Sequence, residues 1–452
     1  MNSKKRIAVV GAGPKGIALA SKAHVLRQQG IADIEVVIYE EADVAANWDG
    51  EHGFTDGNQK LGTPPDKDIG FPYKSIFGYE NDRELMRLSW NNYLVAKEKF
   101  SGYVDRGKPN PTHKIWAKYL RWVLSEIGQQ ITVSRVVGFD ISSNDGVLIV
   151  SSRSSDDDVV EKSKFDGIVF TGPGEPTKIV GSKHDWSESI IDGRQFWQRI
   201  PVFQSMAGKN KKIAVIGGGE TAASIVVSLI ENAQGLSIDI INRHGTLYTR
   251  GESYHENELY TDPEQWKSLS EADREDFIRR TDRGVFSVES KKTIDHADNI
   301  KIITGNVQEI SKRGSMVSVT VYRGTGQIHS YSYDKVIIAT GFDPLSPLDL
   351  LPAHKRNKQV ITPSGEKNDV FKFLRKEVDY HLRVPMPFDL KIRKKVHMPM
   401  LSAFSQGPGL PNLSCLGVLS DRILSAYISE EMKEKYINKE DLEMVRYESD
   451  NL

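Results

Sequence analysis

Two glycine-rich turns in this 452-residue sequence have the spacing needed to hold a dinucleotide. The first spans Gly11 to Gly16, directly after a short β-branched run at residues 7–10 and before a helical pattern at residues 17–27. In a GxGxxG turn, the first glycine permits the tight bend and the second lets the backbone approach a pyrophosphate. The third lets the helix pack close to the strand. The turn positions expected to contact the phosphates, at the positive end of the helix, are Gly11, Gly13, Pro14, Lys15 and Gly16.

The residues after the next strand indicate which nucleotide the first turn binds. The strand expected at residues 34–39 ends in Glu40 and Glu41. A carboxylate at this position accepts hydrogen bonds from ribose hydroxyls and repels a 2′-phosphate. The first site is therefore predicted to bind FAD or NAD rather than NADP.

The second turn repeats the pattern in the middle of the chain with one informative change. A strand at residues 212–216 precedes it, a helix at 223–231 follows, and Ala222 replaces the third glycine. The next strand, at 237–241, leads to Arg243 instead of an acid. A guanidinium can pair with both oxygens of a 2′-phosphate, so the pattern favours NADPH. The candidate NADPH contacts are Gly217, Gly219, Glu220, Thr221 and Arg243, with Arg250 as a second arginine.

Two strands that end in Thr-Gly indicate how the two nucleotide sites are connected. They lie at residues 166–172 and 334–342. We expect an α/β protein with two Rossmann-like domains, in which the NADPH domain at 209–330 is inserted into a discontinuous FAD domain formed by 1–208 and 331–452. The alternative interpretation of each Thr-Gly strand is an ordinary buried strand with no role in connecting the two nucleotide sites.

Composition excludes several classes of protein. Basic and acidic residues number 60 and 61, so no charge excess points to nucleic acid or an anionic membrane. No apolar run is long enough to span a bilayer. Cys415 is the single cysteine, which rules out the dithiol of flavin disulfide reductases and a cysteine-based metal site, and fits a cytoplasmic protein. We expect no bound metal.

Several segments resemble the ornithine/lysine N-hydroxylases of siderophore biosynthesis, and the resemblance spans most of the chain. It rests on the first glycine-rich turn, Asn47-Trp48, Gln59 with Lys67-Asp68, His113 with Trp116, Tyr119 and Leu120, Ser253-Tyr254 with Asn257-Glu258, Ala339-Thr340-Gly341, and Leu419-Ser420-Asp421. The fingerprint of class B (Baeyer–Villiger-like) monooxygenases is degenerate here, because the nearest segment, residues 181–186, has the wrong spacing.

The resemblance implies roles for individual residues. Trp48, Gln59, His113, Thr340, Gly341 and Leu419 would contact FAD, and Ser253 would contact NADPH. Lys67 would pair with a substrate carboxylate, Asn257 would bind the amino-acid head group, and Ser420 would help to fix it. A helical segment at about 251–300 would face the substrate. For Ser420 the alternative is an N-cap, since Ser420 and Asp421 are expected to open a helix.

The implied reaction is N-hydroxylation of a primary amine by a flavin C(4a)-hydroperoxide, so the cofactor carries the chemistry and no catalytic protein residue is expected. Ornithine or lysine is the default substrate, and aspartate or a small diamine would fit the same chemistry. The alternatives are a class B monooxygenase, an NADPH–flavin electron-transfer reductase and a non-catalytic flavin-binding protein. The other expected partners are O2 and further copies of the chain, as a tetramer or dimer.

Overall fold

The first parallel sheet forms around the apolar run at the start of the chain. In the computed structural model, β1 (Lys5–Val10) lies between β2 (Ile34–Glu40) and β7 (Gly167–Phe170), with β3 (Ile131–Val133) and β18 (Val396–His397) at the two edges. All four strand pairs are parallel. Because β1 lies in the middle of the sheet, its apolar side chains are covered on both faces, as its β-branched composition predicts.

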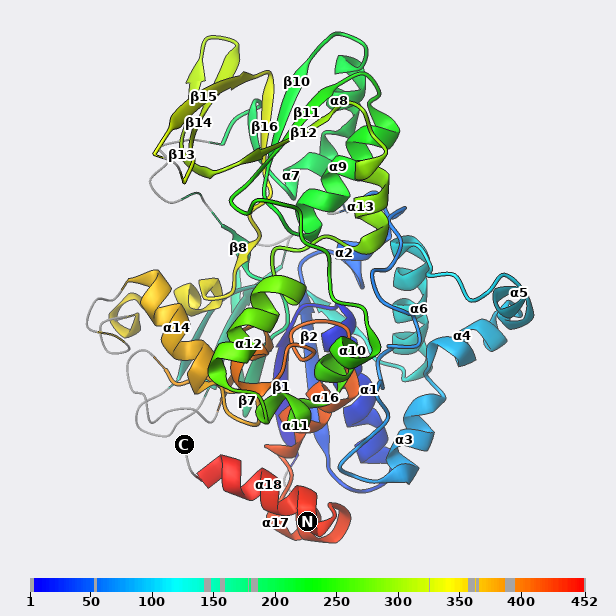
Figure 1. Ribbon diagram of the computed structural model, residues 1–452. Helices are drawn as coiled ribbons and strands as arrows, with labels where there is room; N and C mark the ends of the chain where they lie inside the picture. Colours follow the sequence, from blue (N-terminus) through cyan, green and yellow to red (C-terminus); the bar gives the residue numbers. More distant parts are fainter. Residues whose placement is uncertain are drawn as a thin grey trace.

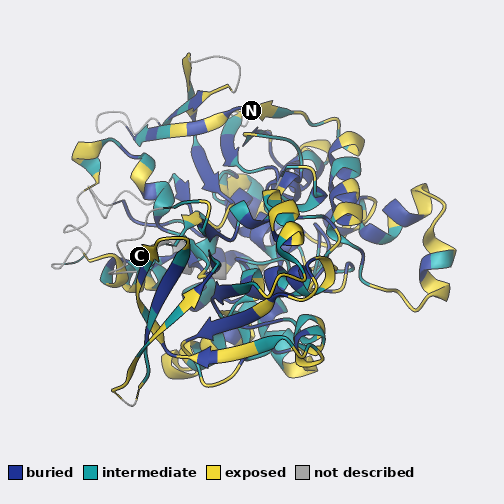
Figure 2. Cartoon of the chain, turned by 90° about the horizontal axis from the view of Figure 1, so that it is seen from above, coloured by how far each residue is buried: buried dark blue, intermediate teal, exposed yellow. Residues whose placement is uncertain are grey.

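The structure describes residues 4–450, except 53–54, 142–147, 155–158, 178, 180–185, 325, 357–361, 363–365 and 387–394. Most of the segment considered as a class B fingerprint, at 181–186, therefore lies outside the described residues. Figure 2 shows that buried residues concentrate along the strands, while the outer faces of the surrounding helices are exposed.

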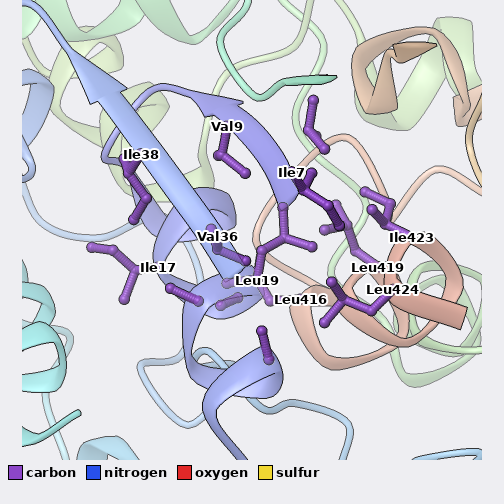
Figure 3. Packing of buried hydrophobic residues seen from close by; sticks show 14 of the residues in the cluster. Ile7, Val9, Ile17, Leu19, Val36, Ile38, Leu416, Leu419, Ile423 and Leu424 are labelled. Carbon is purple, nitrogen blue, oxygen red and sulfur yellow. The ribbon is translucent and has the colours of Figure 1, made fainter. Parts of the chain in front are cut away.

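Helices from opposite ends of the chain cover the first sheet. In Figure 3, α1 (Pro14–Gln28) and α16 (Leu416–Ser425) bring Leu19 and Leu419 together with Ile7 of β1, and all three side chains are fully buried. We call this half of the molecule the first lobe. Its core needs both ends of the chain, so the expected discontinuous arrangement is confirmed.

The second lobe is built on another parallel sheet. Its strands, in spatial order, are β12 (Ile300–Thr304), β11 (Ser237–Asn242), β10 (Lys212–Ile216), β16 (Lys335–Ile338) and β9 (Ile190–Asp192). Figure 1 shows α9 (Glu220–Asn232) and α13 (Val288–Asp295) on one face, and the antiparallel strands β13 (Asn306–Arg313), β14 (Met316–Tyr322) and β15 (Ile328–Tyr333) on the other. Two of its strands, β9 and β16, lie outside the expected range of 209–330.

Alternate residues of β10 serve the two faces of this sheet. Ile213 and Val215 belong to the core beneath α9, whereas Ala214 and Ile216 pack toward the antiparallel sheet. This alternation is the two-residue period of a strand that is covered on both sides. The strand is therefore rigidly held at the point where it enters the second glycine-rich turn.

Two short strands carry the chain between the lobes. β8 (Glu175–Pro176) pairs antiparallel with β17 (Phe342–Asp343). Next to this pair, the Thr340 hydroxyl donates to the Thr177 carbonyl at 3.1 Å, and the Thr177 N–H donates to the Gly341 carbonyl at 2.9 Å. The two expected Thr-Gly strands are thus β7 and β16, one in each lobe, and the crossing strands follow them.

A helical segment between β11 and β12 lies against the first lobe. It consists of α10 (Tyr254–Thr261), α11 (Pro263–Lys267), α12 (Glu271–Phe277) and a π-helical turn, η1 (Ile278–Asp282). The fully buried Trp266 donates from Nε1 to the Phe404 carbonyl at 2.9 Å. Lys376 of α14 (Lys367–Glu377) pairs with Glu271 at 2.6 Å. Figure 1 shows α12 beside α14. Of the helices in the expected 251–300 segment, α13 packs on the second sheet instead.

The remaining elements complete the two lobes. They are α2 (Ala46–Asp49), α3 (Tyr79–Met86), α4 (Trp90–Ala96), α5 (Phe100–Asp105), α6 (His113–Glu126), β4 (Arg135–Ile141), β5 (Leu148–Arg153), β6 (Val160–Phe165), α7 (Gln195–Gln198), α8 (Ile200–Met206), η2 (Ser346–Leu350), η3 (Ala353–Lys355), η5 (Pro399–Leu401), α15 (Ala403–Gln406), α17 (Glu430–Tyr436) and α18 (Lys439–Asp450). Among the residues that the structure describes, no helix combines the length and the apolar character needed to cross a membrane.

Candidate cofactor and substrate site

The first glycine-rich turn has the shape of a phosphate cradle. Gly11 has a φ of +110°, and a Cβ atom there would lie 2.5 Å from the Thr171 hydroxyl oxygen. A Cβ atom at Gly16 would lie 2.2 Å from the Gly11 carbonyl oxygen. At Gly13 no heavy atom lies within 4 Å of the corresponding position. The turn therefore excludes side chains where the backbone packs and leaves open space in front of the helix N-terminus, which fits a pyrophosphate.

Charged side chains flank this turn. Lys15 is partly buried, and its pKa is lowered to about 8 by burial and by the nearby Arg283 guanidinium. The Glu40 carboxylate accepts hydrogen bonds from the Ala12 N–H at 2.9 Å and the Glu41 N–H at 3.0 Å. Glu40 thus fixes the turn to the end of β2, and its predicted contact with a ribose stays a prediction.

Three residues assigned to FAD by resemblance converge at the start of α6. The rings of Trp48 and His113 lie 4.7 Å apart in an edge-on arrangement. The His113 backbone N–H donates to the Gln59 carbonyl at 2.8 Å, and the Thr55 hydroxyl donates to the Gln59 side chain. Nδ1 of His113 is buried without a hydrogen-bond partner, and burial lowers the His113 pKa to about 4. A neutral, unsatisfied imidazole beside a tryptophan fits a polar ring system bound here.

The second turn is equally constrained. Gly217 has a φ of +149°, and a Cβ atom there would lie 2.2 Å from the Ala339 carbonyl oxygen. The position of a Gly219 Cβ lies 3.6 Å from Gly284 Cα, so the chain that follows η1 passes in front of this turn.

Side chains at the start of α9 bind the segment at 284–287, which passes in front of the second turn. The Ser287 N–H donates to the Glu220 carboxylate at 2.8 Å. Thr221 lies behind the turn, where a Cβ atom at Gly193 would come within 2.8 Å of its methyl carbon. Glu220, which was predicted to contact NADPH, therefore also binds the backbone of the residues that cover the turn.

Cations gather beyond the end of β11. Arg243 is exposed there, and the neighbouring His244 has its pKa lowered by burial and by the charges of Arg243 and Arg279. The structure therefore places a second arginine, from η1, near the one predicted from the sequence. This positive region fits the 2′-phosphate of NADPH.

The structure brings together the two residues predicted to bind the amino-acid head group. Lys67 Nζ donates to Asn257 Oδ1 at 2.7 Å, which joins a loop of the first lobe to α10. The Asn257 amide nitrogen donates to the carbonyls of Glu252 at 3.0 Å and Ser253 at 3.1 Å, so its orientation is fixed. Ser253, assigned to NADPH by resemblance, is the N-cap of α10 and accepts from the Glu256 N–H at 3.3 Å.

The environment of Lys67 is apolar and positive. The side chain is 9% exposed, and its ammonium lies 5.7 Å from the centre of the Phe71 ring. Burial and the Arg250 charge lower the Lys67 pKa to about 8. At pH 7 the group is still mostly protonated, which suits it to bind a carboxylate.

Comparison with known proteins agrees with this geometry. The sequence pattern of the L-lysine 6-monooxygenase/L-ornithine 5-monooxygenase family matches residues 86–344. L-lysine N6-monooxygenase MbtG of Mycobacterium sp. (strain MCS) is 37% identical over 427 residues, covering 93% of this chain and 94% of the relative. The chain belongs to this family.

Further relatives support the assignment. MbtG of Mycobacterium tuberculosis is 35% identical over 93% of this chain and 95% of its own length. Lysine monooxygenase NbtG from Nocardia farcinica, whose NADPH domain has been described as having an unprecedented conformation, superimposes with a TM-score of 0.78 at 34% identity, over 93% of this chain and 99% of that one. The ornithine hydroxylase PvdA from Pseudomonas aeruginosa shares the fold, with a TM-score of 0.70 at 20% identity, over 94% of this chain and 99% of that one.

Family membership establishes the class of reaction. The chain is a flavoprotein N-monooxygenase with FAD and NADPH as its cofactors, and the shapes of the two glycine-rich turns fit the dinucleotides. In the part of the chain that the structure describes, no group of three or more His, Cys, Asp or Glu side chains is arranged to hold a metal ion.

One interpretation of the C-terminal motif is wrong. In this lysine/ornithine monooxygenase α16 begins at Leu416, so Ser420 lies inside the helix and cannot be its N-cap. Ser420 is fully buried, and its hydroxyl donates to the Leu416 carbonyl at 2.9 Å. Leu419 is equally buried in the core of the first lobe. Both side chains are engaged within the protein, so their roles toward substrate and FAD stay predictions.

Sequence reasoning missed the partner of Asp421. The Asp421 carboxylate and the Lys22 ammonium are both buried and lie 2.7 Å apart, which joins α16 to α1. Ser75 also donates to Asp421 at 3.1 Å. The signal in the sequence was a lysine in the middle of the mostly apolar helical pattern at 17–27, because a buried lysine needs an acid in a fixed position.

Proposed function

We propose that this enzyme hydroxylates the side-chain amine of L-lysine to give N6-hydroxy-L-lysine. One observation carries the proposal: Lys67 and Asn257 meet at 2.7 Å between a first-lobe loop and α10, where an amino-acid head group can bind. The 35–37% identity to L-lysine N6-monooxygenases over 93% of the chain supports lysine rather than ornithine. L-ornithine, aspartate and diamines remain in the test as competing substrates.

The residues around the FAD site would hold the cofactor and exclude water. Gly13 and Lys15 would receive the pyrophosphate, while Trp48, Gln59 and His113 would lie beside the flavin ring. Bound FAD would supply the redox chemistry that activates O2, from which one oxygen atom is transferred to the amine. Leu419, Thr340 and Gly341 are kept as further contacts to FAD.

The substrate residues would set the position and the charge of the amino acid. The Lys67 ammonium would pair with the α-carboxylate, and an apolar environment at the other end of the substrate would favour an uncharged amine, because burial disfavours the ammonium form. A free alkylamine has a pKa of about 10.4, so the site has to favour the neutral form for attack on oxygen. Gly217, Gly219, Glu220, Thr221, Arg243 and Ser253 remain the proposed NADPH contacts.

The proposal extends to the cellular setting. The two nucleotide-binding domains would correspond to the two lobes, with the boundaries of the second at about 188 and 340 as its strands require. We place the reaction in siderophore biosynthesis in the cytoplasm. Exposed apolar side chains on α3 to α6, among them Tyr79, Val95 and Phe100, support a homo-oligomer, which sedimentation at several protein concentrations would test.

The decisive experiment compares product with NADPH consumed. Purified, FAD-loaded enzyme would be supplied with NADPH, oxygen and, separately, L-lysine, L-ornithine, L-aspartate, cadaverine or putrescine. The proposal expects one hydroxylamine per NADPH with L-lysine and poorer coupling with the others. Tight coupling with another amine instead would replace lysine as the substrate, and hydrogen peroxide as the only product with every amine would refute N-hydroxylation of this set.

A further inference from the structure

Arg250 was predicted from the sequence as a second contact to NADPH, and its side chain also lies near the residues predicted to bind the substrate. Its guanidinium carbon is 5.1 Å from the centre of the Tyr260 ring, and Tyr260 lies one turn beyond Asn257 on α10. Its Nη2 lies 3.5 Å from the hydroxyl of Ser414, which is fully buried in the segment before α16. Arg250 therefore reaches from the second-lobe connection to the same place in the first lobe as the Lys67–Asn257 contact.

Neither cation is directly paired with an acid in the part of the chain that the structure describes, and the Lys67 ammonium is hydrogen-bonded to an uncharged amide. The Arg250 charge does reach the Glu220 carboxylate, where it opposes the rise in the Glu220 pKa that burial causes. Burial is the main cause of the lowered Lys67 pKa, and repulsion by the Arg250 charge adds to it. An anion bound between the two cations would relieve this repulsion.

We infer that Lys67 and Arg250 form a two-cation receptor for the α-carboxylate of the substrate, which makes this enzyme selective for α-amino acids over diamines. This inference rests on the proposed function and names the part of the substrate that the site recognises. Arg250 is a specificity-determining residue, because cadaverine differs from L-lysine only by the missing carboxylate. Its backbone N–H donates to the Phe286 carbonyl at 2.9 Å, so a side-chain substitution leaves the chain path supported.

The test measures binding as well as turnover. Arg250→Gln and Arg250→Lys would be compared with wild type for L-lysine, cadaverine and L-norleucine, which keeps the α-carboxylate but has no side-chain amine to hydroxylate. Isothermal titration of the FAD- and NADP⁺-loaded protein gives the affinities without catalysis. Arg280→Gln is the matched control, because Arg280 is 62% exposed on η1 and pairs with Asp276 at 3.5 Å.

A charge-assisted hydrogen bond of ordinary strength corresponds to a roughly tenfold to hundredfold change in affinity. Arg250→Gln should weaken L-lysine and L-norleucine by that factor and cadaverine by less than about threefold, and Arg250→Lys should recover part of the loss. The receptor would be overturned if Arg250→Gln weakened the binding of the two amino acids and of cadaverine by the same factor. It would also be overturned if the substitution weakened NADP⁺ binding and left the ratio of the L-lysine and cadaverine affinities unchanged.

Failure of the proposed function would look different. If wild type binds L-norleucine in an Arg250-dependent way but hydroxylates neither L-lysine nor L-ornithine, the receptor stands and the proposed reaction fails. If wild type hydroxylates cadaverine in preference to L-lysine and putrescine in preference to L-ornithine, amine hydroxylation stands and the receptor is wrong.

Discussion

Asn257→Ala should change the pH dependence of L-lysine binding, because Asn257 is the hydrogen-bond acceptor for the Lys67 ammonium. The contact is 2.7 Å long and Lys67 is 9% exposed, so water replaces the lost acceptor poorly. A hydrogen bond to a charged group is worth about 1.5–3 kcal/mol, and 1.36 kcal/mol corresponds to a tenfold change in ionisation. The substitution should therefore lower the Lys67 pKa from about 8 to roughly 6–7.

The direction of the pH effect depends on which form of Lys67 binds the substrate carboxylate. The ammonium form exists below the pKa, so affinity for L-lysine should be full at low pH and decline as pH rises through about 8 in wild type. In Asn257→Ala the same decline should begin at roughly 6–7. At pH 7.5 the protonated fraction would fall from about three quarters to about one quarter or less, before any direct loss of contact is counted.

Arg250→Gln provides a comparison with the opposite sign. Removing the guanidinium removes a repulsive charge, so the Lys67 pKa should rise above about 8 and the decline should move to higher pH. Cys415 is the other titratable group near Lys67, and burial raises its pKa to about 12, so it stays neutral over this range.

The assay is KM for L-lysine at half-unit steps from pH 6 to pH 9 for the three proteins. Differences between variants cancel the ionisation of the substrate itself. If Asn257→Ala raises KM by the same factor at every pH, the Asn257 amide contacts only the substrate. The predicted effect of Asn257 on the Lys67 pKa would then be refuted. A shift in the same direction for both variants would refute the electrostatic explanation.

Further substitutions test three other parts of the structure. Gly13→Ala should leave the melting temperature of the apoprotein unchanged and reduce the FAD content measured by absorbance, whereas Gly16→Ala should prevent folding, since only the first position has open space beside it. Arg243→Gln should raise KM for NADPH roughly tenfold or more and leave KM for NADH nearly unchanged; a parallel rise for both nucleotides would contradict a 2′-phosphate contact. Lys22→Met should lower the free energy of unfolding by about 3–5 kcal/mol, because it leaves Asp421 buried without its cation. Adding Asp421→Leu should recover much of this loss, as measured by denaturant titration.

The sequence predicted the geometry of the two glycine-rich turns well because their requirements are local. A φ of +110° at Gly11 and a backbone contact at Gly16 concern residues within one turn, so the residue types themselves carry the information. The bounds of β10 were predicted for the same reason, since this strand occurs at the expected residues 212–216, whereas β16 is shorter than the strand expected at 334–342. The α1 boundary was less well predicted, because Pro14 begins the helix inside the motif.

Contacts between distant segments were less predictable. Nothing near Arg250 in the sequence shows that its guanidinium would lie over Tyr260, and its proximity to Arg243 in the chain suggested the cofactor instead. The strands β9 and β16 joined the second sheet from outside the expected range, because sheet membership depends on pairing partners far away in the chain. Ser420 shows a third reason why a prediction can fail. Ser-Asp often begins a helix, but α16 begins one turn earlier, at Leu416.

The position of α10 explains why substrate and cofactor recognition must be tested together. The helix belongs to the chain between two strands of the second sheet, yet the segment that follows it is tied to the first lobe through Trp266 and Glu271. Arg250 lies in the connection that leads to α10, and its backbone is bonded to Phe286 in the segment that passes in front of the second turn. A substitution at Arg250 can therefore alter L-lysine affinity either directly or through the segment in front of the second turn. Only measurement of both affinities on one variant separates the two, and L-norleucine makes this possible without turnover.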